Sequence, residues 1–183
     1  TGEMTSRKGR ALLAELFLES GRNDEGQAVI EALAGTDPRD AITLYLKGRL
    51  ALIQQRRVDA RALLSQAIAL QGAKAGPHLW LGQLELIEGH MEQGEALLQK
   101  AAQLDQEHAL THVLLAKLYL KQHRYERAET EALEVLRRNP AHLEAALLYG
   151  DSHAGRDNWG QAETIYARIR DQLPSSSLGY RKL

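Results

Sequence analysis

The sequence repeats itself at a constant interval of 34 residues over most of its length, and no insertion or deletion interrupts the register. Small residues recur in two columns of this register. The first column is Ala14, Gly48, Gly82, Ala116 and Gly150, and the second is Gly26, Ala60, Gly94, Ala128 and Ala162. A fixed period of about 20 to 50 residues indicates a solenoid, in which each repeat is one supersecondary unit whose apolar face is covered by its neighbours.

Each repeat has the pattern of two helices joined by a short turn. Within residues 109–140, apolar residues recur at spacings of three and four, which is typical of helices. A polar break at residues 122–124 separates two such stretches, and Asn139 with Pro140 ends the second. In two other repeats Gly21 and Gly89 occupy the turn, where a residue that adopts positive φ easily ends the first helix at low cost. The small columns let the two helices approach closely where they cross.

At these positions the chain resembles the tetratricopeptide repeat. That family's pattern has Leu-Gly followed by an aromatic residue in the first helix, Gly at the turn, and Ala, an apolar residue and a closing Pro in the second. The fourth unit matches with Leu115, Ala116, Tyr119, Ala128, Val135 and Pro140, and the fifth with Tyr149, Gly150, Ala162, Tyr166, Ile169 and Pro174. The first unit matches with Leu13, Ala14, Phe17, Gly21, Ile30 and Pro38. The second and third units match at fewer positions, and Lys47 and Glu85 stand there at usually apolar positions. The resemblance covers residues 7–176.

The resemblance implies an all-α fold, a right-handed superhelical solenoid of antiparallel helix pairs. We expect one solenoid over residues 1–183. Its predicted repeats are 7–40, 41–74, 75–108, 109–142 and 143–176, with the start of a sixth at 177–183. Because Tyr180 and Leu183 continue the pattern into that sixth repeat, we expect the chain to be a piece of a longer array.

Composition disfavours several functional classes. The net charge is −1, from 23 basic and 24 acidic residues mixed along the chain, whereas a nucleic-acid-binding surface usually has a basic excess. The sequence has no cysteine, which excludes thiol catalysis and Cys-ligated zinc. It also has no Gly-rich phosphate loop and no recognisable nucleophile with its base. We therefore predict a non-enzymatic protein without a cofactor.

Three histidines raise the question of a metal site. His108 and His112 are one helical turn apart, and His78 has the repeat position of His112 one unit earlier. No His-Glu-x-x-His motif accompanies them, and zinc sites need ligands that are held by further hydrogen bonds. The sequence therefore favours solvated or groove-lining histidines and predicts no metal site.

The resemblance also implies where a partner binds, because the first helices of such arrays form a concave wall. In this sequence the wall positions make two apolar stripes beside one polar stripe. The first apolar stripe is Ala11, Tyr45, Leu79, Val113 and Leu147; the polar stripe is Glu15, Arg49, Gln83, Lys117 and Asp151; the second apolar stripe is Leu18, Leu52, Leu86, Leu120 and Ala154. This pattern predicts a groove for an apolar or amphipathic protein segment. The predicted groove residues are Tyr45, Arg49, Leu52, Leu79, Gln83, Leu86, Val113, Lys117, Leu120, Leu147 and Asp151.

Alternatives to this groove remain open at the level of sequence. The second apolar stripe has the composition of a buried core. In the polar stripe, Glu15 and Arg49, or Lys117 and Asp151, can pair with each other across repeats. The array can also be a spacer arm of a bacterial envelope-assembly or polysaccharide-export machine, can self-associate, or can recruit substrate for a catalytic domain elsewhere in a parent chain. The compartment, cytoplasm or bacterial periplasm, is equally open.

Overall fold

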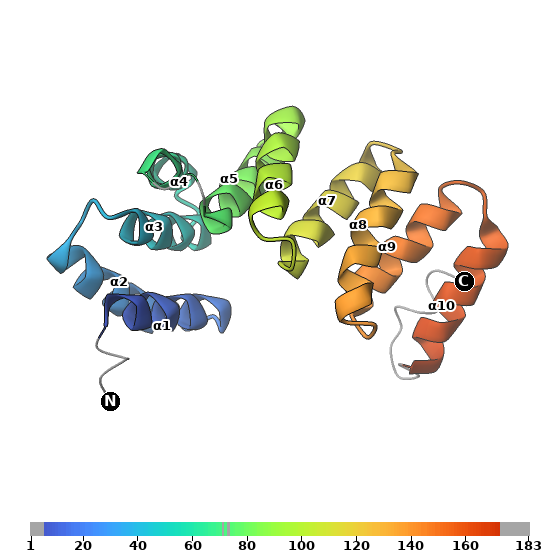
Figure 1. Ribbon diagram of the computed structural model, residues 1–183, viewed down its shortest axis with the longest axis horizontal. Helices are drawn as coiled ribbons and strands as arrows, with labels where there is room; N and C mark the ends of the chain where they lie inside the picture. The colour runs from blue at the N-terminus through green and yellow to red at the C-terminus, as the bar shows by residue number, and fades with distance from the viewer. Residues whose placement is uncertain (1–5, 71, 73, 173–183) are drawn as a thin grey trace. The chain divides into compact units, whose positions relative to one another are not determined.

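The computed structural model describes residues 6–70, 72 and 74–172, and all regular structure in this part of the chain is α-helical (Figure 1). Helices alternate as first and second members of pairs. The first helices are α1 (Arg7–Glu19), α3 (Ala41–Ile53), α5 (Ala75–Ile87), α7 (Ala109–Lys121) and α9 (Leu143–Ala154). The second helices are α2 (Asn23–Thr36), α4 (Arg57–Leu70), α6 (Met91–Leu104), α8 (Tyr125–Arg138) and α10 (Trp159–Gln172). The predicted all-α fold of helix pairs is therefore confirmed.

The start of every helix follows the repeat of the sequence. First helices begin at residues 7, 41, 75, 109 and 143, and second helices at residues 23, 57, 91, 125 and 159, so both series have a spacing of 34 residues. In the repeat analysed above, α7 ends at Lys121 and α8 ends at Arg138, directly before Asn139 and Pro140. The predicted turn and the predicted end of the second helix are confirmed there.

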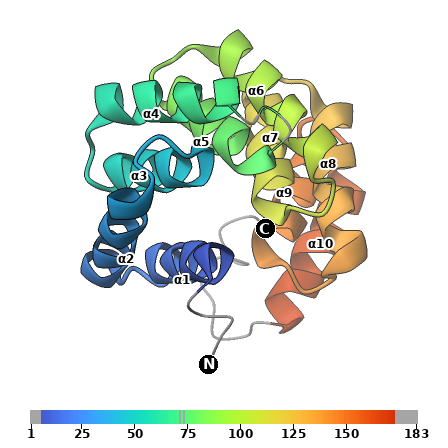
Figure 2. The same ribbon diagram turned by 60° about the vertical axis from the view of Figure 1, so that its left-hand side comes forward.

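The helices fall into two compact units, Thr1–Leu104 and Asp105–Leu183. In the first unit, α3 packs on α1 and α2 as well as on its pair partner α4, and α5 packs on α3, α4 and α6. In the second unit, α9 packs on α7, α8 and α10. Figure 2 shows the pairs of each unit from a second side. Within each unit, a first helix therefore covers the apolar face of the pair that precedes it.

Some sequence-based expectations concern residues that the structure does not describe. The start of a sixth repeat at 177–183, with Tyr180 and Leu183, lies outside the described residues, as does Pro174. The repeat boundaries and the organisation as one solenoid stay predictions.

All five turns within the pairs have the same backbone conformation at the same repeat position. Gly21 and Gly89 have φ of 73° and 89°, which confirms the predicted role of these glycines. The corresponding residues Gln55, His123 and Asp157 also have positive φ, between 58° and 60°. In each turn the next residue's backbone N–H donates to the carbonyl five residues earlier, over 2.8–3.0 Å. This bond is the mark of a Schellman C-cap, so the turn geometry is kept with or without glycine.

The small columns lie where the helices of a pair cross. A Cβ added at Gly82 would be 3.2 Å from the carbonyl oxygen of Gly94, and one added at Gly94 would be 3.1 Å from that of Gly82. A Cβ at Gly48 would be 2.7 Å from Leu64 Cγ. These distances are too short for an unstrained side chain, which confirms that close helix crossings require the small residues.

The described part of the chain contains no bilayer-spanning helix, because its helices are too short and insufficiently apolar. Its apolar side chains instead pack between helices. In the first unit, one core cluster joins Leu18, Ile30, Leu33, Leu46 and Leu50, which come from three successive helices.

Candidate partner-binding site

In the first unit, six predicted groove residues lie on α3 and α5. Leu79 and Arg49 are buried, with 1% and 5% of their surface exposed. Tyr45, Leu52, Gln83 and Leu86 are half-buried and reach the surface. A partner can therefore contact these four side chains, whereas the buried Leu79 belongs to the interior of the wall.

One cluster of side chains on this wall contains Tyr45, Arg49 and Trp80. The Arg49 guanidinium carbon lies 4.5 Å from the centroid of the Trp80 ring, within the range of a cation–π interaction. Arg49 Nη1 is also 3.8 Å from Glu19 Oε1. Gly76 lets Tyr45 approach α5, since a Cβ there would be 2.9 Å from the tyrosine hydroxyl. The buried Arg49 contacts both α1 and α5, so its role is structural.

Burial also favours the neutral form of the tyrosine in this cluster. Burial raises the pKa of Tyr45 to about 12, against the partly opposing effect of the Arg49 charge. A phenol is neutral at physiological pH even at its ordinary pKa of about 10, and the shift extends this range, so Tyr45 can donate a hydrogen bond to an incoming polar group.

In the second unit, α7 and α9 carry the other five predicted groove residues. Val113 is buried, Lys117 is exposed, and Leu120, Leu147 and Asp151 are half-buried. Lys117 Nζ lies 2.5 Å from Glu144 Oε1, and both side chains are half exposed. The Tyr166 hydroxyl donates a 2.6 Å hydrogen bond to Asp151 Oδ1, which ties α10 to α9. Lys117 is the predicted groove residue of this unit that lies most open to solvent.

The second apolar stripe contains both buried and half-buried side chains. Leu18 is 6% exposed and packs close to Gly26 of its own pair, as expected of core. Leu52, Leu86 and Leu120 are only half-buried. Their packing contributes to the core, and the remaining exposed surface is available to a partner.

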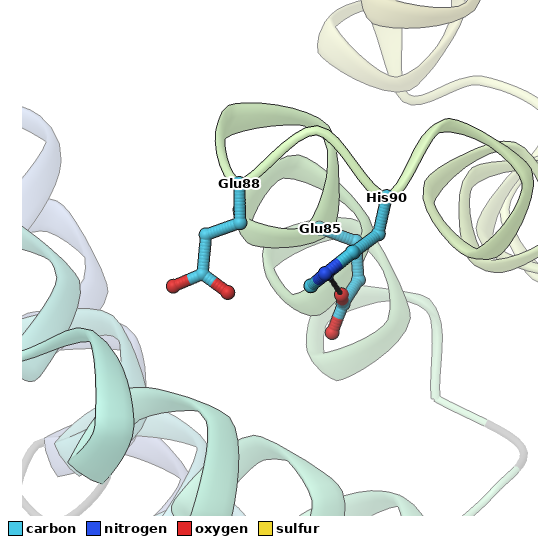
Figure 3. Close-up of side chains that lie close together, drawn as sticks. All are labelled: Glu85, Glu88 and His90. Atoms are coloured by element: carbon cyan, nitrogen blue, oxygen red, sulfur yellow. Dashed lines mark hydrogen bonds and ion pairs between the residues drawn. The ribbon is translucent and has the colours of Figure 1, made fainter.

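A second cluster, which the groove prediction did not include, joins α4 to the end of α5. The Arg61 guanidinium donates to Glu85 and to Glu88, and His90 Nδ1 lies 2.7 Å from Glu85 Oε2. Figure 3 shows Glu85, Glu88 and His90 together, with the contact between His90 and Glu85 marked. The Glu85 side chain is 4% exposed, so Arg61 balances a buried carboxylate. In the sequence, this cluster was indicated only by Glu85, an acidic residue at a usually apolar position.

The second unit has the same arrangement with its charges reversed. Two repeats after Arg61 the position holds Glu129, and two repeats after Glu85 and Glu88 the positions hold His153 and Arg156. Arg156 donates to Glu129, and His153 Nε2 lies 3.6 Å from Glu129 Oε1. In the first unit the arginine is on the second helix of one repeat; in the second unit it lies in the turn that follows the first helix of the next repeat.

Among the described residues, Glu85, Glu88 and His90 have ligand atoms close enough to hold a metal, all within 4.8 Å of one another. Because Arg61 already binds both carboxylates, the geometry is that of an ion-pair network. The sequence had pointed to other histidines. His78 Nδ1 lies 2.8 Å from the Lys74 carbonyl oxygen, and His108 Nδ1 lies 3.3 Å from the Thr111 hydroxyl.

His112 makes a buried link between α7 and α8. Its Nδ1 lies 2.6 Å from Glu131 Oε2 and its Nε2 lies 2.9 Å from the Gln106 carbonyl oxygen. The hydrogen bond to Glu131 raises the pKa of His112 above its ordinary value, although desolvation opposes the shift. This histidine therefore stabilises the second unit from within.

Solved structures confirm the fold. The chain is similar to MamA, with a TM-score of 0.73, 17% identity, and coverage of 88% of this chain and 95% of that one. For YrrB, described as a TPR protein with an unusual peptide-binding site, the TM-score is 0.72 with 15% identity over 96% and 91% of the two chains. For pilF of Pseudomonas aeruginosa the TM-score is 0.78 and the identity is 17%, with coverage of 93% of this chain and 78% of that one. A search of curated proteins finds no match.

Matches to models of protein families show the family of this chain. One tetratricopeptide repeat model matches residues 11–77 and 113–177, and a second matches residues 85–137. Together these matches span most of the sequence and all five helix pairs. The turn geometry, the small residues at the helix crossings and the spacing of 34 residues between successive pairs agree with them. The chain belongs to the tetratricopeptide repeat family.

Proposed function

We propose that this protein is a non-enzymatic scaffold that binds a segment of a partner protein along the wall of its first helices. Tetratricopeptide repeats in general mediate interactions between proteins, and YrrB, which shares the fold, has a peptide-binding site. The observation that carries the proposal is the set of half-buried apolar side chains beside polar ones on α3 and α5. Leu52 and Leu86 retain exposed surface on the same helices as the half-buried Tyr45 and Gln83.

The chemistry of the wall indicates the chemistry of the partner. In the first unit, Leu52 and Leu86 offer apolar contacts, and the Tyr45 hydroxyl offers a hydrogen bond. In the second unit, Leu120 lies on α7 with the exposed cation Lys117, and Leu147 lies on α9. An amphipathic segment with apolar anchors and an acidic or carbonyl group fits both sets of side chains.

A charge placed on the wall tests this proposal. Leu86→Glu introduces a carboxylate at the proposed contact, and Leu70→Glu is the matched control at a 58% exposed position on α4, a second helix. Each protein serves as bait for the same peptide library, and the captured peptides are then titrated. We expect Leu86→Glu to weaken peptide affinity at least tenfold and Leu70→Glu to leave it unchanged, with both variants retaining the helical circular dichroism of the wild type.

Equal affinity for the wild type and Leu86→Glu would place the binding site on another surface. Failure of the wild type to select any peptide would leave the spacer arm of a bacterial envelope machine as the better prediction.

A further inference from the structure

A hollow of about 260 Å³ lies between α2, α3 and α4 of the first unit, and none of its lining residues belongs to the predicted groove. We name it the Lys47 hollow. Its apolar lining residues are Ile30 of α2, Leu50 of α3 and Leu63 of α4, and its charged ones are Glu31 of α2, Lys47 of α3 and Arg56 in the turn before α4. Lys47 is about 160° around the helix axis from both Tyr45 and Arg49. The hollow therefore lies on the side of α3 that faces away from the wall.

Lys47 stands where other repeats have a buried leucine. One and two repeats later the position holds Leu81 and Leu115, which are 7% and 1% exposed. Lys47 is half-buried and lines an open hollow. At this junction between repeats, a cation has thus replaced a residue of the apolar core.

The next junction shows how the corresponding space is occupied elsewhere in the unit. There Arg61 and Glu85 stand at the positions of Gln27 and Ala51, and they bond from α4 to α5. Between α2 and α3, Gln27 is neutral and Ala51 is too short to reach across. The Lys47 hollow therefore has no ion-pair network of this kind.

The ammonium group of Lys47 makes no hydrogen bond or ion pair with any residue that the structure describes. The other two charged side chains of the hollow are already bonded. Arg56 Nη1 lies 2.9 Å from Asp59 Oδ2, and Glu31 Oε1 accepts a 2.7 Å hydrogen bond from Gln27 Nε2. The hollow thus combines an unpaired ammonium group with an apolar floor. Its lining holds two cations and one carboxylate, so its charge favours an anionic ligand.

The volume of the hollow limits the kind of ligand. Sites for small molecules usually enclose roughly 300–1,000 Å³. A hollow of about 260 Å³ holds one or two side chains of a partner protein and not a molecule the size of a cofactor. A carboxylate complements the Lys47 ammonium group, and an apolar side chain complements Ile30 and Leu63.

We propose that the Lys47 hollow is a second binding site, which takes an acidic side chain and the apolar side chain next to it from a segment of a partner protein. The acidic residue is an internal one, because the backbone N–H that follows it can donate to Glu31, whereas a C-terminal carboxylate has no such N–H. Since this site and the wall lie on different sides of α3, a segment bound in the hollow leaves the wall accessible.

Two blocked tripeptides that differ by one charge test the site. Ac-Leu-Glu-Leu-NH2 and Ac-Leu-Gln-Leu-NH2 are each titrated into the isotope-labelled full chain, and amide chemical shifts are followed by NMR. We expect the glutamate peptide to shift the amides of Gln27, Glu31 and Lys47, with a dissociation constant on the order of 1 mM for so small a contact. The glutamine peptide should bind at least tenfold more weakly, because it cannot pair with the ammonium group.

Substitution of the lysine supplies the second test. Lys47→Leu introduces the residue type of the next two repeats, so the variant should fold without loss of thermal stability and bind the glutamate peptide at least tenfold more weakly. Lys100→Leu, at an exposed position on α6, is the matched control and should leave this affinity unchanged. Leu86→Glu alters the wall and should leave it unchanged too, so the outcomes for the two sites can be told apart.

Equal affinity for the two peptides, undiminished binding to Lys47→Leu, or shifts confined to amides of the wall would overturn the proposal. An absence of shifts at about 10 mM peptide, ten times the expected dissociation constant, would overturn it as well. In that case Lys47 only extends its ammonium group into water and the hollow is filled by solvent.

Discussion

At the scale of single residues, Gln55 occupies a backbone conformation that disfavours side chains, with φ of 60°. Left-handed backbone costs an L-residue about 1–2 kcal/mol, whereas glycine adopts it freely but loses more entropy on folding. We therefore expect Gln55→Gly to raise the free energy of unfolding by about 0.5–1 kcal/mol. Urea denaturation followed by circular dichroism measures this difference.

The same turn in the first repeat supplies the reverse experiment. Gly21 has φ of 73° and open space where a Cβ would be, so Gly21→Ala tests backbone strain without a clash. We expect it to lower the free energy of unfolding by about 1 kcal/mol. If both substitutions left stability unchanged, the shared turn conformation would not be a source of strain.

The His112 contact predicts how stability depends on pH. Its folded-state pKa is raised by Glu131, so the unfolded protein loses this proton at lower pH than the folded one. The added stability is fully present below the unfolded-state value, about 6.5, and is lost as pH rises through the folded-state pKa. Thermal unfolding of the wild type and His112→Gln across this range should show their stabilities converging as pH rises. A constant difference would contradict the ion pair.

At the scale of secondary-structure elements, the crossing of α5 and α6 depends on Gly94. Alanine is the better helix former by about 1 kcal/mol, but its Cβ at this position would overlap Leu86 and approach the Gly82 carbonyl oxygen to 3.1 Å. We expect Gly94→Ala to lower the free energy of unfolding by about 1–3 kcal/mol, because overpacking displaces the helices.

Gly35 is the matched control, since it lies in α2 with nothing within 4 Å of its would-be Cβ. Gly35→Ala should raise the free energy of unfolding by up to about 1 kcal/mol. Chemical denaturation of the two variants side by side separates the crossing contact from helix propensity. Equal effects of the two substitutions would mean that the crossing tolerates a methyl group.

Helix positions were predictable from the sequence because they depend on spacing within one repeat. The column of small residues, the turn glycines Gly21 and Gly89, and the stop at Pro140 all act locally. Exposure of the groove residues was less predictable. Leu79 and Val113 share a wall column with the half-buried Tyr45, yet both are buried, because the depth of a side chain depends on how adjacent helices pack.

The contacts of Arg61 show the same limit. The sequence marked Glu85 as unusual, but its partner is 24 residues away on the preceding helix. Periodicity tells which positions face inward and not which two side chains meet across neighbouring helices. Tertiary packing decides that pairing.

At the scale of the whole molecule, the array is stabilised by contacts between adjacent helices, so a helix that buries few residues or packs on few neighbours is held least firmly. α10 packs principally on α9, whereas α9 packs on α7, α8 and α10. In the first unit, α1 buries Ala11, Ala14 and Leu18, and α3 buries many more residues. Local opening should therefore be more frequent in α1 than in α3, and in α10 than in α9.

Hydrogen exchange followed by mass spectrometry measures this gradient. Amides of α1 should exchange at least tenfold faster than those of α3. Amides of α10 should likewise exchange faster than those of α9. Uniform protection over all helices would indicate that each unit opens only as a whole.

The reversed polarity of the two ion-pair networks bears on how such an array can change in evolution. A duplication that inserted the second repeat in place of the fourth would bring the guanidinium of Arg61 against His153 and Arg156, and the reciprocal exchange would bring Glu129 against Glu85 and Glu88. Two guanidinium groups and a histidine, or three carboxylates, would then share a partly buried junction. Unequal recombination between these similar segments would therefore destabilise the folded product, so the second and fourth repeats are not interchangeable.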